Sequence, residues 1–190
     1  MKTKGLDNRQ HIIQAANMLF YHQGFNQTSF TEIADAAGIP RGNFYYYFKT
    51  KDDILAAVID DRIQRTRVML AEWDQQYPNP KERLQRFITM LLNSQEDLVR
   101  YGCPIGSLMV ELSKTQQAMQ TKTKDMFDVF LHWLTRQFEA LGCGAEAHLF
   151  ALRLLSRAQG VSLITNAYAD ADFLRTEIAQ LRQWLDTLKS

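Results

Sequence analysis

Side chains that can read nucleic acid are concentrated in residues 41–51, RGNFYYYFKTK. The Arg41 guanidinium can donate two hydrogen bonds to guanine in the major groove, and the Asn43 amide suits adenine. Between them, Gly42 has no side chain to hold the backbone away from DNA. Arg41 and Asn43 are therefore predicted to contact base edges, with the backbone at Gly42 close to the DNA.

Phosphate contacts are expected from the hydroxyls of three consecutive tyrosines and from a lysine at a helix N-terminus. Thr28, Ser29 and Thr31 can add hydroxyl contacts from the preceding helix. The predicted DNA-binding residues are Thr28, Ser29, Thr31, Arg41, Gly42, Asn43, Tyr45, Tyr46, Tyr47 and Lys51.

Two short helices must position these groups. Ser29 and Glu32 have the spacing of a capping box, which predicts a helix that begins after Ser29 and ends at Gly38. A short third helix follows over residues 41–48, with Phe44 and Phe48 as core anchors at i and i+4. Two short helices joined by a glycine-bearing turn predict a helix-turn-helix.

The spacing T-x-x-E-I-A-x-x-A-G-I-x-R-G-x-F-Y-x-Y-F-x-x-K-x-x-I-L resembles the N-terminal DNA-binding domain of the TetR/AcrR family of transcriptional regulators. The motif is carried by Thr28 or Ser29, Glu32, Ile33, Ala34, Ala37, Gly38, Ile39, Arg41, Gly42, Phe44, Tyr45, Tyr47, Phe48, Lys51, Ile54 and Leu55. The length of the chain and its helical C-terminal part also fit this family.

The resemblance implies a homodimer that binds a palindromic double-stranded DNA operator. Its two helix-turn-helix domains, here called heads, would occupy successive major grooves. By position, Arg41, Gly42 and Asn43 match the family's base-facing residues, whereas Tyr45, Tyr47 and Lys51 match its phosphate-facing ones. The role of Tyr46 stays open. Repression is the commoner mode in the family and is the expected one here, with activation as the alternative.

The net charge of +1 does not by itself indicate a nucleic-acid partner. Residues 1–53 contain six Lys or Arg and five Asp or Glu, so even this segment is almost neutral. Binding would depend on a few placed groups, and its salt dependence is expected to be modest for each head because hydroxyl contacts release few counterions.

The composition, with 46% hydrophobic and 23% charged residues in a chain of 190, is that of a globular protein with a real core. It excludes a disordered chain, a collagen-like fibre and a disulfide scaffold. We expect a cytoplasmic protein with reduced cysteines, because the first residues lack an apolar signal region and no apolar stretch is long enough to cross a bilayer.

The predicted fold class is all-α. A first helix is expected over residues 8–23, and a longer helix begins at Lys51. Further helices are predicted over residues 80–100, 104–119, 122–141, 145–168 and 172–188. The expected domains are a helix-turn-helix domain over residues 1–53 and a ligand-binding and dimerisation domain over residues 54–190.

The last two predicted helices are candidates for a four-helix bundle between two chains. Leu174, Ile178, Leu181, Leu185 and Leu188 are spaced 4, 3, 4 and 3, which is typical of an a/d seam. The alternative is that these helices pack within one monomer. In the preceding helix, Gly160 predicts a close backbone approach.

The family's larger domain usually holds a small-molecule effector, here expected to be apolar or aromatic. The candidate pocket residues are Met90, Cys103, Met109, Met126, Phe130, Trp133 and Phe150, and each of them could instead be plain core. His132 could hydrogen-bond such a ligand or lie at the surface.

Cys103 directly precedes a predicted helix start, where a thiolate is favoured. The surrounding segment weakly resembles NemR-type members of the family, which respond to electrophiles through a cysteine. A buried structural thiol is the alternative for Cys103.

An enzyme is not expected. The sequence contains no H-E-x-x-H, G-x-S-x-G, phosphate-binding loop or paired cysteines with zinc spacing. No cofactor or metal is predicted. A helical ligand-binding module without DNA binding is a further alternative, but it predicts damage in residues 28–51, which are intact.

Overall fold

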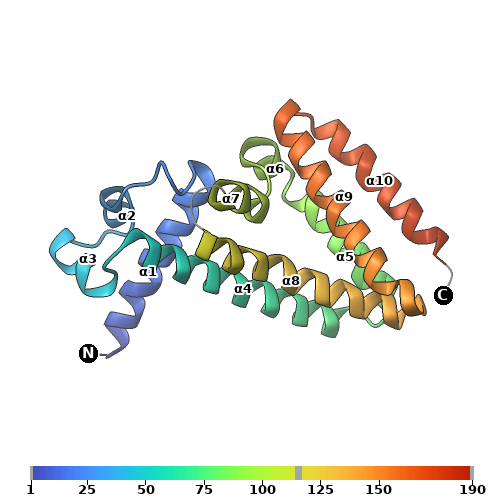
Figure 1. The fold of residues 1–190 in the computed structure, drawn as a ribbon, viewed down its shortest axis with the longest axis horizontal. Helices are drawn as coiled ribbons and strands as arrows, with labels where there is room; N and C mark the ends of the chain where they lie inside the picture. The colour runs from blue at the N-terminus through green and yellow to red at the C-terminus, as the bar shows by residue number, and fades with distance from the viewer. Residues whose placement is uncertain (1, 114–116, 189–190) are drawn as a thin grey trace. The chain divides into compact units, whose positions relative to one another are not determined.

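The computed structural model describes residues 2–113 and 117–188, and every regular element in these residues is helical, which confirms the all-α class. Figure 1 shows the succession of helices along the chain. They are α1 (Lys2–His22), α2 (Phe30–Ala36), α3 (Arg41–Tyr47), α4 (Lys51–Gln76), α5 (Pro80–Asn93), α6 (Gln95–Tyr101), α7 (Pro104–Ser113), α8 (Gln117–Ala140), the 3-10 turn η1 (Gly144–Glu146), α9 (Ala147–Tyr168) and α10 (Ala171–Thr187).

One predicted helix is divided in two. The expected helix over residues 80–100 breaks at Ser94, where the backbone turns to φ −103° and ψ 16°. Ser94 closes α5 by donating its N–H to the Met90 carbonyl at 3.2 Å. It also opens α6 by accepting the Leu98 N–H at 2.8 Å. Because neither glycine nor proline stands there, the sequence gives no strong signal of the break.

The chain forms two compact units, which we describe separately. The first comprises Met1–Gln64 and Ser107–Met126, and the second comprises Arg65–Gly106 and Phe127–Ser190. Helices α4, α7 and α8 therefore contribute residues to both units. The predicted border between residues 53 and 54 separates a DNA-binding part from a ligand-binding and dimerisation part, and it stays a prediction.

The first unit has its own core around α1. Ile12, Ile13 and Ala16 of α1 are buried in this core. Phe44 and Phe48 are also buried, at 1% and 4% exposure, as the spacing in the third helix predicted. Burial of large aromatic side chains of this kind contributes several kcal/mol (about 3–5 for Phe on truncation to Ala), so it holds α3 against α2, where Phe44 meets Phe30.

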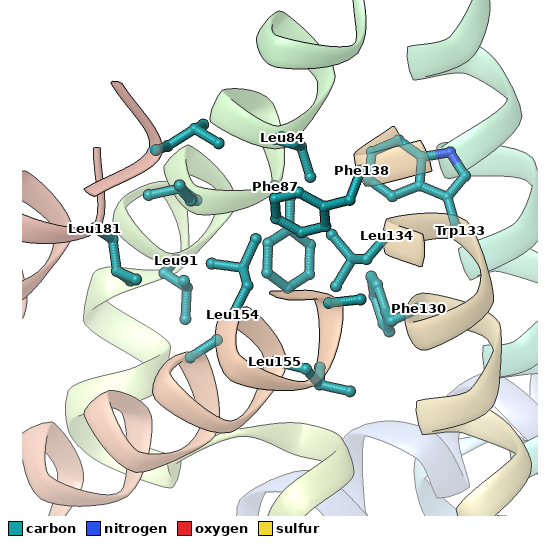
Figure 2. Close-up of a cluster of buried hydrophobic side chains, with 14 of the residues drawn as sticks. Leu84, Phe87, Leu91, Phe130, Trp133, Leu134, Phe138, Leu154, Leu155 and Leu181 are labelled. Atoms are coloured by element: carbon teal, nitrogen blue, oxygen red, sulfur yellow. The ribbon is translucent and has the colours of Figure 1, made fainter. Parts of the chain in front are cut away.

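The second unit is built on a continuous apolar cluster from α4, α5, α6, α8, α9 and α10. Figure 2 shows its centre, where Phe87 of α5 and Phe138 and Leu134 of α8 lie above Leu154 of α9. Phe87 and Phe130 meet edge to face, with ring centroids 5.7 Å apart. Edge-to-face contact is a favoured geometry for aromatic pairs and adds to the area that is buried.

The leucine seam of α10 belongs to this cluster, which corrects its interpretation as a seam between chains. Leu174, Leu181 and Leu185 are fully buried, and α10 packs on α5 and α9 of the same chain. The expected close approach at Gly160 is also absent within the chain, since a Cβ built there meets no described atom within 4 Å.

No helix among the described residues is long and apolar enough to cross a membrane.

Candidate nucleic-acid interface

The turn between α2 and α3 is fixed by local chemistry that the sequence predicted. The Ser29 hydroxyl accepts the Glu32 N–H at 3.1 Å, and Glu32 accepts the Ser29 N–H at 2.7 Å, which confirms the capping box. Hydrogen bonds from Ser29 lower the pKa of the Glu32 carboxyl, because they favour its charged form. Gly38 then takes a φ of +66°, as its predicted left-handed role requires.

The buried side of α3 determines which of its residues face solvent. Phe44 is anchored edge to face against Phe30, with centroids 5.0 Å apart. Because Phe44 and Phe48 face the core, Gly42 and Asn43 on the other side are exposed. The side chain of Arg41 lies outside the described residues; its backbone forms the first residue of α3.

The three tyrosines of α3 have different surroundings. Tyr46 is the most exposed at 82%, and Tyr45 is 55% exposed and stacks on Phe30 with centroids 5.4 Å apart. Tyr47 is half-buried, and its hydroxyl oxygen accepts a hydrogen bond from the Asn8 amide at 3.1 Å. An accepting hydroxyl keeps its own hydrogen, so Tyr47 can still donate to a phosphate.

Two predicted contact residues hold the head together. Thr28 is 1% exposed, and its hydroxyl donates to the Gly24 carbonyl at 2.7 Å. The Lys51 ammonium donates to the carbonyls of Phe25 and Thr28, both at 2.9 Å, and lies 4.3 Å from the centroid of the Phe25 ring. In this arrangement the Thr28 hydroxyl and the Lys51 ammonium are directed at the loop before α2. Ser29 and Thr31, in contrast, are exposed.

Glu111 is a positioning residue that the sequence did not reveal. Its carboxylate accepts the backbone N–H groups of Phe25 at 2.9 Å and Asn26 at 2.6 Å, in the same loop. Both partners lie more than 80 residues away, so no local pattern could indicate the contact. The apolar stretch SLMVELS around Glu111 is the sole hint, because a lone carboxylate there needs a partner.

The candidate pocket residues do not gather at one place. Phe130 and Trp133 belong to the core of the second unit, and Met90, Cys103 and Phe150 pack on that core. Met109 and Met126 belong to the first unit, where the Thr123 hydroxyl donates to the Met109 sulfur at 3.0 Å. Of the seven, Trp133 also lines an open groove between α4 and α8, together with His132.

The two cysteines form no disulfide and differ in their surroundings. The Cys103 sulfur accepts the Gly106 N–H at 3.5 Å, so the thiol stands at the N-terminus of α7, as predicted. Burial and the neighbouring Glu146 carboxylate raise the pKa of the Cys143 thiol.

Among the residues that the structure describes, no group of three or more His, Cys, Asp or Glu side chains could hold a metal ion.

Comparison with known proteins assigns residues 12–58 to the family described as bacterial regulatory proteins, tetR family. An uncharacterized HTH-type transcriptional regulator in the lacX 3'region of Lactococcus lactis subsp. lactis is 25% identical over 183 residues, which are 93% of this chain and 92% of that protein. The HTH-type transcriptional repressor DhaR of Mycobacterium sp. (strain GP1) is 30% identical over 129 residues, 66% of this chain and 61% of DhaR.

The fold also matches a solved structure over most of its length. The reduced form of NemR from E. coli superimposes with a TM-score of 0.83 at 20% identity, covering 93% of this chain and 96% of that one. A capped helix-turn-helix head on an all-helical chain defines the class of HTH-type transcriptional regulators. Residues 12–58 belong to the tetR family of bacterial regulatory proteins, and the comparisons support a TetR-family transcriptional regulator.

Proposed function

We propose that this chain is a repressor that binds a palindromic DNA operator as a homodimer and is released by a small-molecule effector. The observation that carries the proposal is the face of α3, where Asn43, Tyr45 and Tyr46 are exposed above the buried Phe44. A short helix held by its apolar side and presenting amide, hydroxyl and bare backbone is suited to the major groove. The relative DhaR carries the name of a repressor.

The residues of the head divide into two roles. Arg41, Gly42 and Asn43 are proposed to contact base edges, and the hydroxyls of Tyr45, Tyr46 and Tyr47, with Ser29 and Thr31, to contact phosphates. Lys51 and Thr28 are proposed to act by positioning the loop before α2, because their polar atoms bond to its backbone. Since mainly neutral groups would face phosphate, we expect a modest salt slope for each head.

Dimerisation is proposed through the two C-terminal helices, with α9 supplying the apolar contact. One side of α9 exposes large apolar side chains at helical spacing around the bare Gly160. These are Leu149, Leu152, Leu163, Ile164 and Tyr168. An exposed apolar stripe of this kind marks an interaction surface, and the glycine would allow a second helix to come close.

Release by an effector requires coupling between its site and the two heads. Helix α4 is the proposed lever, because it continues without a break from Lys51 to Gln76 and contributes to both units. A typical coupling free energy of about 1–3 kcal/mol changes affinity roughly 5- to 150-fold, which is enough for a switch.

A second candidate function is sensing of electrophiles or oxidants through Cys103. It is favoured by the Gly106 N–H that points at the Cys103 sulfur, since an N–H donor at a helix start stabilises a thiolate. Alkylation of the purified protein should then abolish DNA binding, and Cys103→Ser should retain binding after the same treatment. DNA binding that is unaffected by alkylation would exclude this candidate.

The DNA-binding proposal is tested by selecting genomic fragments with the purified protein. Enrichment of one palindromic sequence is expected, with loss of enrichment in Arg41→Ala and Asn43→Ala. Gln14→Ala is a matched control, because Gln14 is exposed on α1 in the same unit. If no sequence is enriched by the native chain, the proposal is wrong and a ligand-binding module takes its place.

A further inference from the structure

A groove of about 380 Å³ lies on the second unit between α4 and α8. Each helix contributes a stripe with i, i+3, i+4 and i+7 spacing, so the two stripes form facing walls. The lining residues are Arg67, Leu70, Ala71 and Asp74 from α4, and Val129, His132, Trp133 and Arg136 from α8. The volume is within the range of small-molecule sites, about 300–1,000 Å³.

The middle of the groove is apolar. Leu70 and Trp133 are 3% and 2% exposed and belong to the core cluster, so they form a rigid floor. Ala71 and Val129 complete this floor with small or branched side chains. A flat apolar body of one or two rings would displace water chiefly from Ala71 and Val129, which is favourable.

The one carboxylate in the groove is already neutralised. Asp74 accepts the Trp133 indole N–H at 3.0 Å and a Gln137 amide N–H at 3.4 Å. It also pairs with the guanidinium groups of Arg83 at 3.7 Å and Arg136 at 3.6 Å. Two guanidinium groups therefore lie beside one carboxylate, so the net charge of this group of side chains is not negative.

Arg67 adds a further positive charge, which no ion pair among the described residues offsets. It is exposed, and in the described part of the chain it makes no ion pair or hydrogen bond. Asp74 follows it by seven residues, so the two side chains begin about 10 Å apart along α4. The groove thus has an apolar floor with cationic groups toward both ends and the exposed His132 on one wall.

We propose that this groove binds a small amphipathic organic anion. Its rings would lie against Ala71 and Val129, over the edges of Leu70 and Trp133. Its carboxylate or sulfonate would accept hydrogen bonds from Arg67, with Arg136 as the second cation. A planar guanidinium matches a carboxylate with two parallel hydrogen bonds, which favours an anion over a neutral ligand of equal shape.

This inference gives the effector of the proposed function a chemical class, and it rests on that function only for the link to DNA. Binding itself is independent of DNA. Its test therefore uses the full chain without an operator.

Isothermal titration calorimetry with 1-naphthoate is the first experiment, with the neutral 1-naphthalenemethanol as a matched probe of the same ring system. We expect the native chain to bind naphthoate more tightly than the alcohol. Arg67→Gln should weaken naphthoate at least about fivefold and leave the alcohol unchanged, because it removes a charge-assisted bond. Arg153→Gln, an exposed arginine on α9, is the control and should bind both probes normally.

A second variant tests the location of the rings. Ala71 is exposed, so Ala71→Phe should fill the groove without disturbing the core, and both probes should lose affinity. Far-UV circular dichroism identifies a variant that has lost its fold. The inference is wrong if the native chain does not bind naphthoate, if it binds the alcohol equally well, or if both folded groove variants bind naphthoate like the native chain.

The operator is then added to separate the two proposals. Naphthoate that binds in the groove and releases the operator supports both. Naphthoate that binds with the expected variant pattern supports the groove, even if the fragment selection has enriched no operator and the proposed function has failed.

Discussion

Lys51 and Glu111 bind the same loop through opposite poles of its peptide groups. The Lys51 ammonium donates to the carbonyls of Phe25 and Thr28, whereas the Glu111 carboxylate accepts the N–H groups of Phe25 and Asn26. Phe25 is thus held at its N–H by an anion and at its carbonyl by a cation. The loop that these bonds fix leads directly into the N-cap of α2.

Removing the cation should loosen this loop. In Lys51→Ala, carbonyls of the loop lose charge-assisted hydrogen bonds that are each worth about 1.5–3 kcal/mol, so the free energy of unfolding should fall by about that amount. Amide hydrogen exchange at Phe25 and Asn26 should become at least about tenfold faster. Lys49→Ala, an exposed lysine nearby, is the control. Equal exchange rates in the two variants would contradict the positioning role.

Two glycines of the head should respond oppositely to alanine. Gly42 has helical backbone and open space for a Cβ, so Gly42→Ala should raise the free energy of unfolding by up to about 1 kcal/mol. Gly38→Ala also has open space but keeps a φ of +66°, which should cost about 1–2 kcal/mol. Chemical denaturation measures both changes.

The same Gly42→Ala variant tests the approach of α3 to DNA. If the bare backbone lies against the groove, the added methyl group should weaken operator binding at least about tenfold, although the fold is more stable. Fluorescence anisotropy with a labelled operator gives the affinity. An unchanged affinity would place Gly42 away from the DNA.

One aspartate substitution on α9 and one on α10 distinguish the dimer contact from the interior of the chain. Leu163 is 66% exposed on α9, so Leu163→Asp should leave the helical spectrum intact and convert the proposed dimer into a monomer in sedimentation velocity. Leu181 is fully buried on α10, so Leu181→Asp should unfold the second unit, since it buries a charge without a partner. A folded Leu163→Asp dimer would exclude this face of α9.

The capping box should contribute to stability above acid pH. The folded-state pKa of Glu32 is lowered from 4.5, so its contribution is present above that value and is lost as the pH falls through the lower folded-state value. In Glu32→Gln, the loss of stability seen at pH 7 should therefore shrink as the pH falls below 4.5. Urea unfolding at several pH values measures the difference, and a constant difference would show that the charge of Glu32 is irrelevant.

The head was predictable because its signals are local. The Ser29–Glu32 capping box, the glycine turn and the i, i+4 pair of Phe44 and Phe48 each act within a few residues, and the structure confirms all three. The roles of Thr28 and Lys51 were less accessible, because a hydroxyl or ammonium in a sequence carries no sign of its partner. Thr28 bonds within its own loop, and Lys51 reaches back by 23–26 residues.

The C-terminal helices show a different limit. Spacing of 4 and 3 in α10 buries a stripe equally well against another chain or against the same one, so it could not tell the two apart. The structure assigns Leu181 and its neighbours to the interior. The exposed stripe of α9 could not be recognised in the sequence, because α9 is apolar on more than one side, with Leu154 buried and Leu163 exposed.

The tryptophans of the chain provide an intrinsic fluorescence probe of one unit. All three, Trp73, Trp133 and Trp184, lie in the second unit, whereas α3 in the first unit is rich in tyrosine. Selective excitation of tryptophan therefore reports on the second unit, because residues 1–64 and 107–126 of the first unit contain no tryptophan. A ligand that alters tryptophan emission therefore changes the surroundings of the second unit. Tyrosine emission does not distinguish the two units, because Tyr77, Tyr101 and Tyr168 lie in the second one.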